Sequence, residues 1–446
     1  MTETKNRIQL SDHFTYKRLL RFVFPSVAMM VFTSVYGVVD GLFVSNVVGK
    51  TPFAAINLIW PFIMMLCGTG FMMGTGGTAI VSKTLGEGKK ELANKYFTML
   101  TVATVILGIF LSVAGICLVR PISVALGAEG QMLESAVLYG TILLAALPFF
   151  MLQTLFQSFF VAAEKPKLGL WITVGAGLTN IALDAILVFP FGLVGAALAT
   201  VFSQVVGGAI PLLYFFRKNG SLLRFTKTKF YGKVLLRTCT NGMSELMGNI
   251  SASLIGTLFN IQLMSLEGEN GVSAYGVIMY VSFLFASIFF GYSVGSAPVI
   301  GYNYGAENKE ELKSLFKKSL RLMVIGGAVM AAASISAASP LSELFVGYDR
   351  KLCDMTAHGF VLYAFHFLLC GVNIFASSMF TALNNGTVSA IISFLRTFGF
   401  QVVLVLTLPV VWGIDGIWLS VTIAEALALL VSIIFILKNK NKYGYM

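Results

Sequence analysis

The sequence predicts an all-α integral membrane protein in which twelve transmembrane helices form two pseudo-symmetric six-helix lobes around a central cleft. Three observations lead to this fold class. The composition is 57% hydrophobic and only 11% charged, which is far from the balance of a soluble domain. Apolar runs of spanning length recur along the whole chain. The order of short motifs in the first half also returns in the second half.

The residue pattern excludes several other classes. A transmembrane β-barrel needs alternating polar and apolar residues, whereas residues 102–119 and 399–411 are almost continuously apolar. The five cysteines are odd in number and have no CxxC spacing, so they indicate neither a disulfide framework nor a zinc site. The net charge of +11 is dispersed over short gaps between apolar runs, and we therefore expect no nucleic-acid partner.

Twelve apolar runs are long enough to cross a bilayer, which takes about 20 residues. We expect helices at residues 17–45, 53–80, 96–119, 134–160, 168–189, 192–216, 235–264, 272–299, 315–338, 356–381, 387–410 and 414–437. The first run lacks a small-residue cleavage site, so we interpret it as a spanning helix and not as a cleaved signal peptide.

The Lys and Arg residues predict the orientation of these helices. If both termini face one side, 27 of the 31 Lys and Arg residues lie on that side, and only Lys50, Arg120, Arg350 and Lys351 lie on the other. Connections rich in Lys and Arg stay in the cytoplasm. We therefore expect a multi-pass protein of the cell membrane with both termini cytoplasmic and a basic face that contacts anionic lipid headgroups.

Motifs of the first half return in the same order about 219 residues later. The turn Gly86–Leu92 is similar to the turn Gly305–Leu312. The other pairs are Leu19-Leu20-Arg21 with Leu235-Leu236-Arg237, Pro190 with Pro409, and Gly192-x-x-Gly195 with Gly413-x-x-Gly416. Six helices separate the copies, so both halves enter the membrane from the same side, as in a parallel repeat.

The repeat divides the chain into an N-lobe at residues 1–216, a basic linker at residues 217–234 and a C-lobe at residues 235–446. Two lobes with one interface imply a central cleft that can open to either side. This arrangement favours a carrier over a pore.

Four carboxylates lie well away from the ends of the predicted helices, namely Asp40, Asp184, Glu245 and Glu425. A charged side chain at the centre of a spanning helix costs on the order of 2.5 kcal/mol or more. Each of the four must therefore face protein or water, and each is a functional candidate.

Asp40 and Asp184 lie at similar depths, roughly 9 to 12 Å below the outer surface, and can share one chamber of the N-lobe. Asn180 and Tyr36 each lie one turn away on the same helix face, and Thr200 lies at a matching depth. Such oxygen ligands suit Na⁺, and two neighbouring carboxylates can also hold one proton. The alternative is a helix clamp, in which Asp184 only bonds Asn180 and nearby backbone.

The C-lobe offers further polar candidates. Glu245 can neutralise a cationic ligand or titrate as a second coupling group, or it can simply bond Ser or Asn across the lobe. Glu425 occupies the repeat position of Gln204, which suggests a polar packing position. Arg396 is deep enough to lie in the cleft but can also extend toward the cytoplasm.

Methionines fall on several helices that are expected to line the cleft. Flexible thioethers accommodate apolar cations of varied shape. The candidates are Met29, Met64, Met243, Met247 and Met279.

The chain resembles the multidrug and toxic compound extrusion (MATE) family, in particular its DinF-like bacterial branch. The similarity covers essentially the whole chain and rests on Pro25, Asp40, Thr179-Asn-x-x-x-Asp184, Ala163-Glu-Lys-Pro166, Met243-Ser-Glu245 and the Gly-x-Gly-Lys-Lys turn. It implies a secondary active antiporter that exports lipophilic, mostly cationic drugs and toxic compounds by alternating access, in exchange for H⁺ or Na⁺.

The resemblance also assigns roles to residues. The family's coupling-ion site maps onto Asp40, Asn180 and Asp184, and less directly onto Tyr36 and Thr200. Pro25 matches the family's helix 1 proline, which permits bending. We expect a monomer that is not an enzyme and has no cofactor besides the coupling ion. Its partners are then small lipophilic cations and membrane lipids.

One departure from the family concerns residues 360–380, which contain no acidic residue. This absence puts a C-lobe sodium site in doubt and shifts weight to the N-lobe. The alternative function is a flippase for lipid-linked precursors on a related fold, which would line its cleft with several Arg or Lys; here only Arg396 is a candidate. An intramembrane enzyme would need an Asp-rich motif, an HExxH pair or a Ser/His dyad, and none is found.

Overall fold

The computed structural model describes residues 8–446, without the side chains of residues 38, 42–46 and 50. Over these residues the regular structure is helical throughout. The helices are α1 (Tyr16–Val47), α2 (Lys50–Gly86), α3 (Lys90–Ala125), α4 (Gly130–Ala145), α5 (Leu147–Ala162), α6 (Pro166–Phe216), α7 (Gly232–Gly305), α8 (Lys309–Val346), α9 (Arg350–Ala364), α10 (Phe367–Ala382), α11 (Gly386–Phe394), a π-helical turn (Leu395–Gly399), α12 (Phe400–Trp412) and α13 (Ile414–Tyr443).

These helices give the predicted twelve spans within residues 8–446. Helix α6 has 51 residues and α7 has 74, and each is broken at one glycine with a positive φ, Gly192 at 53° and Gly268 at 62°. Each of these two helices therefore supplies two spans. In contrast, α4 and α5 meet at a bend of 54° and together form one span, and α9 and α10 do the same at 48°.

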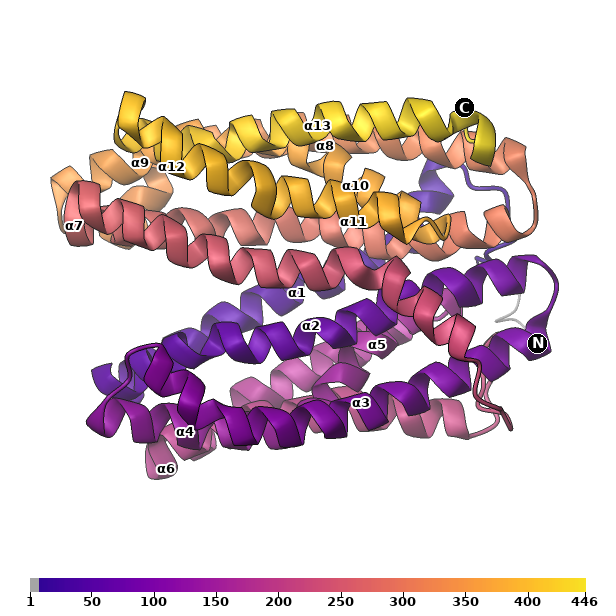
Figure 1. The fold of residues 1–446 in the computed structure, drawn as a ribbon, viewed down its shortest axis with the longest axis horizontal. Coiled ribbons are helices and arrows are strands. Elements are labelled where there is room, and N and C mark those ends of the chain that lie inside the picture. The colour runs from indigo at the N-terminus through magenta and orange to yellow at the C-terminus, as the bar shows by residue number, and fades with distance from the viewer. Residues whose placement is uncertain (1–7) are drawn as a thin grey trace.

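The spans form two bundles that lie side by side, α1–α6 in one and α7–α13 in the other (Figure 1). The connection at residues 217–231 and the end of α13 lie at the same end of the molecule, at the right of the figure. We call this the basic end. It carries residues 8–15 and the turns after α2, α5, α7 and α10. The predicted linker is shorter in the structure, because α7 already begins at Gly232.

The internal repeat has the same backbone geometry in both lobes. Gly192 and Gly413 have φ/ψ of 53°/−125° and 56°/−136°, values that L side chains rarely adopt. Three residues later, Gly195 and Gly416 touch the carbonyl group eight residues before them. A Cβ at these positions would lie 2.1 Å and 2.4 Å from that oxygen. The Gly-x-x-Gly motif therefore makes the same sharp, tightly packed turn twice.

Glycines also allow the two lobes to pack backbone against backbone. A Cβ on Gly76 of α2 would lie 2.0 Å from a carbonyl oxygen of α7, and one on Gly242 of α7 would lie 2.0 Å from a carbonyl oxygen of α2. Nearer the basic end, a Cβ on Gly86 of α2 would lie 1.9 Å from a carbonyl oxygen of α7, and one on Gly305 of α7 would lie 2.0 Å from a carbonyl oxygen of α2. Small residues are what permit such close helix contacts in membranes. The lobes are therefore tightly closed along this part of their interface.

The segment before α1 ties the two lobes together at the basic end. Leu10 and Phe14 have no exposed surface. The Leu10 amide donates to Glu164 Oε1 of the N-lobe at 2.8 Å, and the Phe14 amide donates to Glu311 Oε1 of the C-lobe at 2.9 Å. Each lobe thus supplies one carboxylate that satisfies a backbone amide of the same short segment.

Candidate functional site

The N-lobe brings two carboxylates together, as predicted. Asp184 on α6 is completely buried and Asn180, one turn earlier, is 2% exposed. Asp40 on α1 is partly buried, and its carboxylate faces the side chains of Asp184 and Asn180. Tyr36 lies one turn before Asp40 on α1 and faces the same carboxylate. Residues nearly 150 positions apart in the chain therefore share one polar chamber.

Several oxygens of this chamber are enclosed without a conventional hydrogen bond. Among the described residues, no hydrogen-bond partner is present for either carboxylate oxygen of Asp184, for Asp40 Oδ1 or for Asn180 Nδ2. The clamp alternative requires Asp184 to be bonded by Asn180 or backbone, and no such bond is present here. Enclosed polar groups without partners are rare, because each costs about 1 to 3 kcal/mol and charged groups cost more. The chamber is therefore suited to take up a proton or a cation.

The sequence analysis did not include Tyr139, which belongs to the same chamber. It lies on α4, is 3% exposed, and faces Asp40, Asp184 and Thr200. The other candidates were found from acids deep in the predicted helices, whereas Glu134, the acid of α4, is exposed near the start of that helix and did not mark Tyr139. The signal that could have marked Tyr139 is its depth in the membrane, because it lies nine residues, or about 14 Å, from the start of α4.

The other polar residues of α6 have more local roles in the structure. The Thr200 hydroxyl donates to the Ala196 carbonyl at 3.1 Å, which leaves its oxygen lone pairs free to face Tyr139. Gln204 is 8% exposed, and its Oε1 is enclosed without a hydrogen-bond partner among the described residues. No three His, Cys, Asp or Glu side chains in this part of the chain form a metal-ligand cluster. A cation bound by Asp40 and Asp184 would therefore also need amide and hydroxyl oxygens.

The C-lobe brings together the remaining ionisable candidates. Arg396 lies in the π-helical turn, and its Nε is 3.7 Å from Glu425 Oε1. Asn373 Nδ2 donates to Glu425 Oε2 at 2.7 Å, and Ser432 Oγ donates to Asn373 Oδ1 at 2.9 Å. Glu245 of α7 lies within electrostatic range of Arg396 but is not paired with it. The guanidinium group of Arg396 is therefore paired with Glu425.

Arg396 does not extend toward the basic end but points into the lobe. Its side chain is 13% exposed, and its Nη1 atom is enclosed without a partner among the described residues. Single π-helical turns are frequent at functional sites, because the extra residue re-aims a side chain. Glu425 is accordingly more than a polar packing position, since it is half of a buried ion pair.

The predicted methionines do not form one cluster. Met29 is 2% exposed, and Met279 Sδ lies 3.7 Å from the Tyr363 hydroxyl oxygen within the C-lobe. Met64, Met243 and Met247 are partly buried. Their contact with a transported compound stays a prediction.

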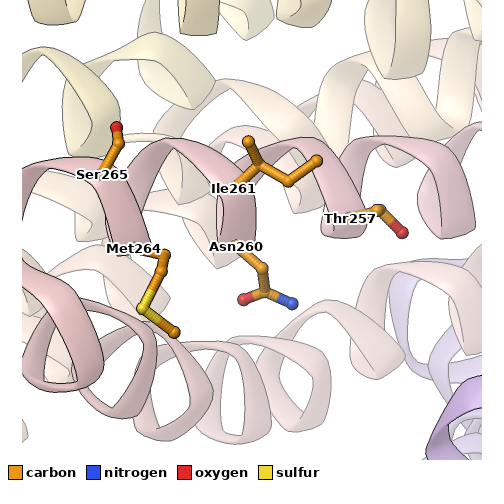
Figure 2. A pocket seen from close by; sticks show the side chains of 5 residues that line it. All are labelled: Thr257, Asn260, Ile261, Met264 and Ser265. Atoms are coloured by element: carbon orange, nitrogen blue, oxygen red, sulfur yellow. The ribbon is translucent and has the colours of Figure 1, made fainter. Parts of the chain in front are cut away.

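A cavity of about 500 Å³ lies against the first half of α7 and does not include these methionines. Its lining residues, shown in Figure 2, are Thr257, Asn260, Ile261, Met264 and Ser265. All five come from one helix, so the two lobes do not jointly enclose this cavity. We assign no site to it.

Pro25 lies inside α1, which continues as a helix on both sides of it from Tyr16 to Val47. It is buried, and it separates the start of α1 from the segment that carries Tyr36 and Asp40. Proline has no N–H group to close the helical hydrogen bond, so bending costs less here than elsewhere in α1.

Two lobes of six spans with parallel repeat symmetry and ionisable residues buried inside both lobes are the architecture of a membrane transporter. Residues 25–186 and 246–407 each match the family model described as MatE. These two matches cover most of the chain, one in each lobe, and the chain belongs to the MatE family.

Relatives with known names support this assignment along the full length. The chain is 25% identical over 435 residues to the "Multidrug export protein MepA" of Staphylococcus saprophyticus, covering 95% of this chain and 94% of the relative. It is also 25% identical over 438 residues to MepA of Staphylococcus aureus, with 95% and 94% covered. A solved structure described as the outward-facing conformation of a multidrug resistance MATE family transporter superposes with a TM-score of 0.92 at 21% identity, covering 99% of both chains. The fold is therefore that of this transporter.

Proposed function

We propose that the protein is an antiporter that exports lipophilic, mostly cationic compounds in exchange for H⁺ or Na⁺ by alternating access. The observation that carries the proposal is the facing pair Asp40 and Asp184, in which both carboxylate oxygens of Asp184 and Oδ1 of Asp40 are enclosed without a hydrogen-bond donor among the described residues. A proton or cation bound there removes the cost of enclosing unpaired carboxylates. The names of the MepA relatives support a multidrug substrate class.

Helix α1 offers a physical connection between this ion site and the lobe interface. A Cβ on Gly291 of α7 would lie 2.5 Å from Val27 Cα of α1, and one on Gly295 would lie 3.0 Å from Val23 Cβ. Asp40 lies 13 residues beyond Val27 on the same helix, which corresponds to about 20 Å. Movement of α1 when Asp40 gains or loses its ion, eased by Pro25, therefore changes the packing of the two lobes.

Export follows if the ion and the compound favour different arrangements of the lobes. Ion uptake at Asp40 and Asp184 stabilises one arrangement, and the compound in the cleft stabilises the other. Glu245 is the carboxylate of the C-lobe that we propose for the compound's positive charge, because Glu425 is fixed by Asn373 while Glu245 remains partly exposed.

The proposed orientation places the basic end in the cytoplasm, with both termini on that side of the cell membrane. We propose a monomeric transporter, with a transported ion in place of any cofactor and no enzymatic step. The flippase alternative is disfavoured because Arg396, its only deep cation candidate, is already paired with Glu425.

Transport of a fluorescent lipophilic cation in proteoliposomes tests the proposal, with Na⁺ and pH gradients imposed separately. We expect Asp40→Asn and Asp184→Asn to abolish gradient-driven transport while the protein remains folded and inserted. Asp354→Asn is the matched control, because Asp354 is an exposed acid paired with Arg350 at the surface. Undiminished transport in both variants would refute the role of the carboxylate pair.

A further inference from the structure

A second cavity, of about 630 Å³, forms a groove between the lobes. It is lined by α2 and α3 of the N-lobe, by the connection at residues 228–230 and by the first turns of α7. The lining residues are Met73, Met99, Val102, Ala103, Ile106, Leu107, Phe110, Thr228, Lys229, Phe230, Leu235 and Cys239. We call it the linker groove.

The wall that α3 contributes to the linker groove is apolar and faces the bilayer. Its six lining residues between Met99 and Phe110 follow the spacing of one helix face. Val102, Ile106 and Phe110 are 51%, 63% and 67% exposed. The stripe spans eleven residue steps, or about 17 Å, close to the roughly 15 Å of one leaflet's hydrocarbon. Its length therefore matches an acyl chain of a single leaflet.

The end of the linker groove nearest the basic end is polar and positively charged. Lys229 lines it, with its Nζ 5.4 Å from the centre of the Tyr231 ring. The ring of Tyr231 lies 5.0 Å from that of Tyr96, and Lys89 and Arg237 are within electrostatic range of Tyr96. The acid at this mouth is Glu87, which is paired with Lys83 and Lys89. The mouth therefore retains an excess of positive charge.

The connection that carries Lys229 is fixed to α3 by hydrogen bonds. The Arg224 amide donates to Asn94 Oδ1 at 2.9 Å, and the Thr226 amide donates to Thr98 Oγ1 at 3.1 Å. Thr228 Oγ1 then donates to the carbonyl of Lys95 at 2.8 Å. Lys229 is thus held at the open end of the apolar stripe.

We propose that the linker groove binds an anionic phospholipid from the leaflet at the basic end. One acyl chain lies along the α3 stripe, and the phosphate lies between Lys229 and Arg237. An apolar stripe adjoining a cationic mouth complements an anionic phospholipid better than one without net charge. Because the walls come from both lobes, the bound lipid contacts both and stabilises the arrangement in which they are closed at this end.

Lipid titration of the purified full-length protein, followed by native mass spectrometry, tests the proposal. The probes are a phosphatidylglycerol and a phosphatidylcholine with identical acyl chains. We expect the first phosphatidylglycerol to bind several-fold more tightly than the first phosphatidylcholine. Lys229→Gln should weaken phosphatidylglycerol about fivefold and leave phosphatidylcholine unchanged, because one positive charge near the headgroup is removed.

Two matched controls separate the site from general lipid contact. Lys218→Gln removes an exposed lysine of the same connection that does not line the groove, and it should have no effect. Ala103→Trp fills the apolar stripe and should weaken the first site for both lipids, whereas Val113→Trp, on an exposed part of α3 outside the groove, should not. Val113 is exposed, whereas Ala103 is partly buried against the core of the N-lobe, so each tryptophan variant must also keep the thermal unfolding profile of the native protein.

Three results would overturn the proposal. Equal affinity for the two lipids would show unselective annular contact. Equal losses in Lys229→Gln and Lys218→Gln would show diffuse charge attraction and no defined site. Displacement of phosphatidylglycerol by inorganic phosphate, together with an unaffected Ala103→Trp variant, would show a site for the ion alone.

Discussion

The reciprocal glycine contacts at the basic end predict that one added methyl group will separate the lobes. A Cβ at position 86 would lie 1.9 Å from the carbonyl oxygen of Tyr302, whereas real Cβ atoms keep at least 3.0 Å from such an atom. In Gly86→Ala the two backbones must therefore move apart by about 1 Å. Overpacking of this kind costs about 1 to 3 kcal/mol. The ratio of the closed to the open population should therefore fall by a factor of about 5 to 150.

Distance measurements between spin labels at Lys89 and Lys309 can detect this change, since these residues are exposed and lie beside the two facing turns. In a cysteine-free background, Gly86→Ala should shift the population toward longer distances. Gly175→Ala is the control, because a Cβ there meets nothing within 4 Å. In a helix, alanine is more favourable than glycine by about 1 kcal/mol. The change in helix propensity alone would therefore not open the lobes in either variant. Identical distance distributions in both variants and the native protein would refute the reasoning.

Three further predictions follow from single side chains. Arg396→Gln leaves Glu425 buried without its cation and should cost about 3 to 5 kcal/mol in thermal unfolding; Arg396→Gln with Glu425→Gln should recover much of it, and no recovery would contradict the ion pair. Glu311→Ala should speed amide exchange of residues 10–14 about 10- to 100-fold because a charged acceptor is lost, while the exposed neighbour Glu310→Ala should change nothing. Tyr139→Phe should slow transport about tenfold without unfolding, whereas the exposed Tyr280→Phe should not.

The fold could be predicted from sequence because the bilayer imposes simple rules on length and polarity. The twelve apolar runs and the Gly-x-x-Gly repeat were enough to place the spans. The ends were less accurate: the third helix was expected at residues 96–119 but extends over Lys90–Ala125, because a helix continues into the headgroup region where polar residues are tolerated. The 54° bend between α4 and α5 was not predicted. Pro148 at the start of α5 marks this break, because a proline lacks the N–H group that would continue the helix from α4, but the expected helix at residues 134–160 ran through it.

The candidate sites show a similar limit. Depth along each helix was sufficient to pair Asp40 with Asp184, since both are single acids in apolar runs. It was not sufficient to pair Arg396 with Glu425, because that contact depends on how the π-helical turn rotates the arginine. Helix rotation is set by packing between spans, which the sequence of one span does not specify.

The two lobes share a fold but differ in how they treat buried charge, and this difference bears on the coupling ion. The N-lobe places Asp40 and Asp184 against each other with no Lys, Arg or His paired to either among the described residues, so a bound proton or cation would neutralise them. In the C-lobe, Glu425 is paired with the guanidinium of Arg396, which is covalently attached and cannot be transported. Gln204, at the repeat position of Glu425, has no charge to neutralise. We therefore expect the exchangeable ion to bind in the N-lobe. Replacing Arg396 and Glu425 together by Gln should then leave the dependence of transport on the ion gradient intact, whereas a lost dependence would place the ion in the C-lobe.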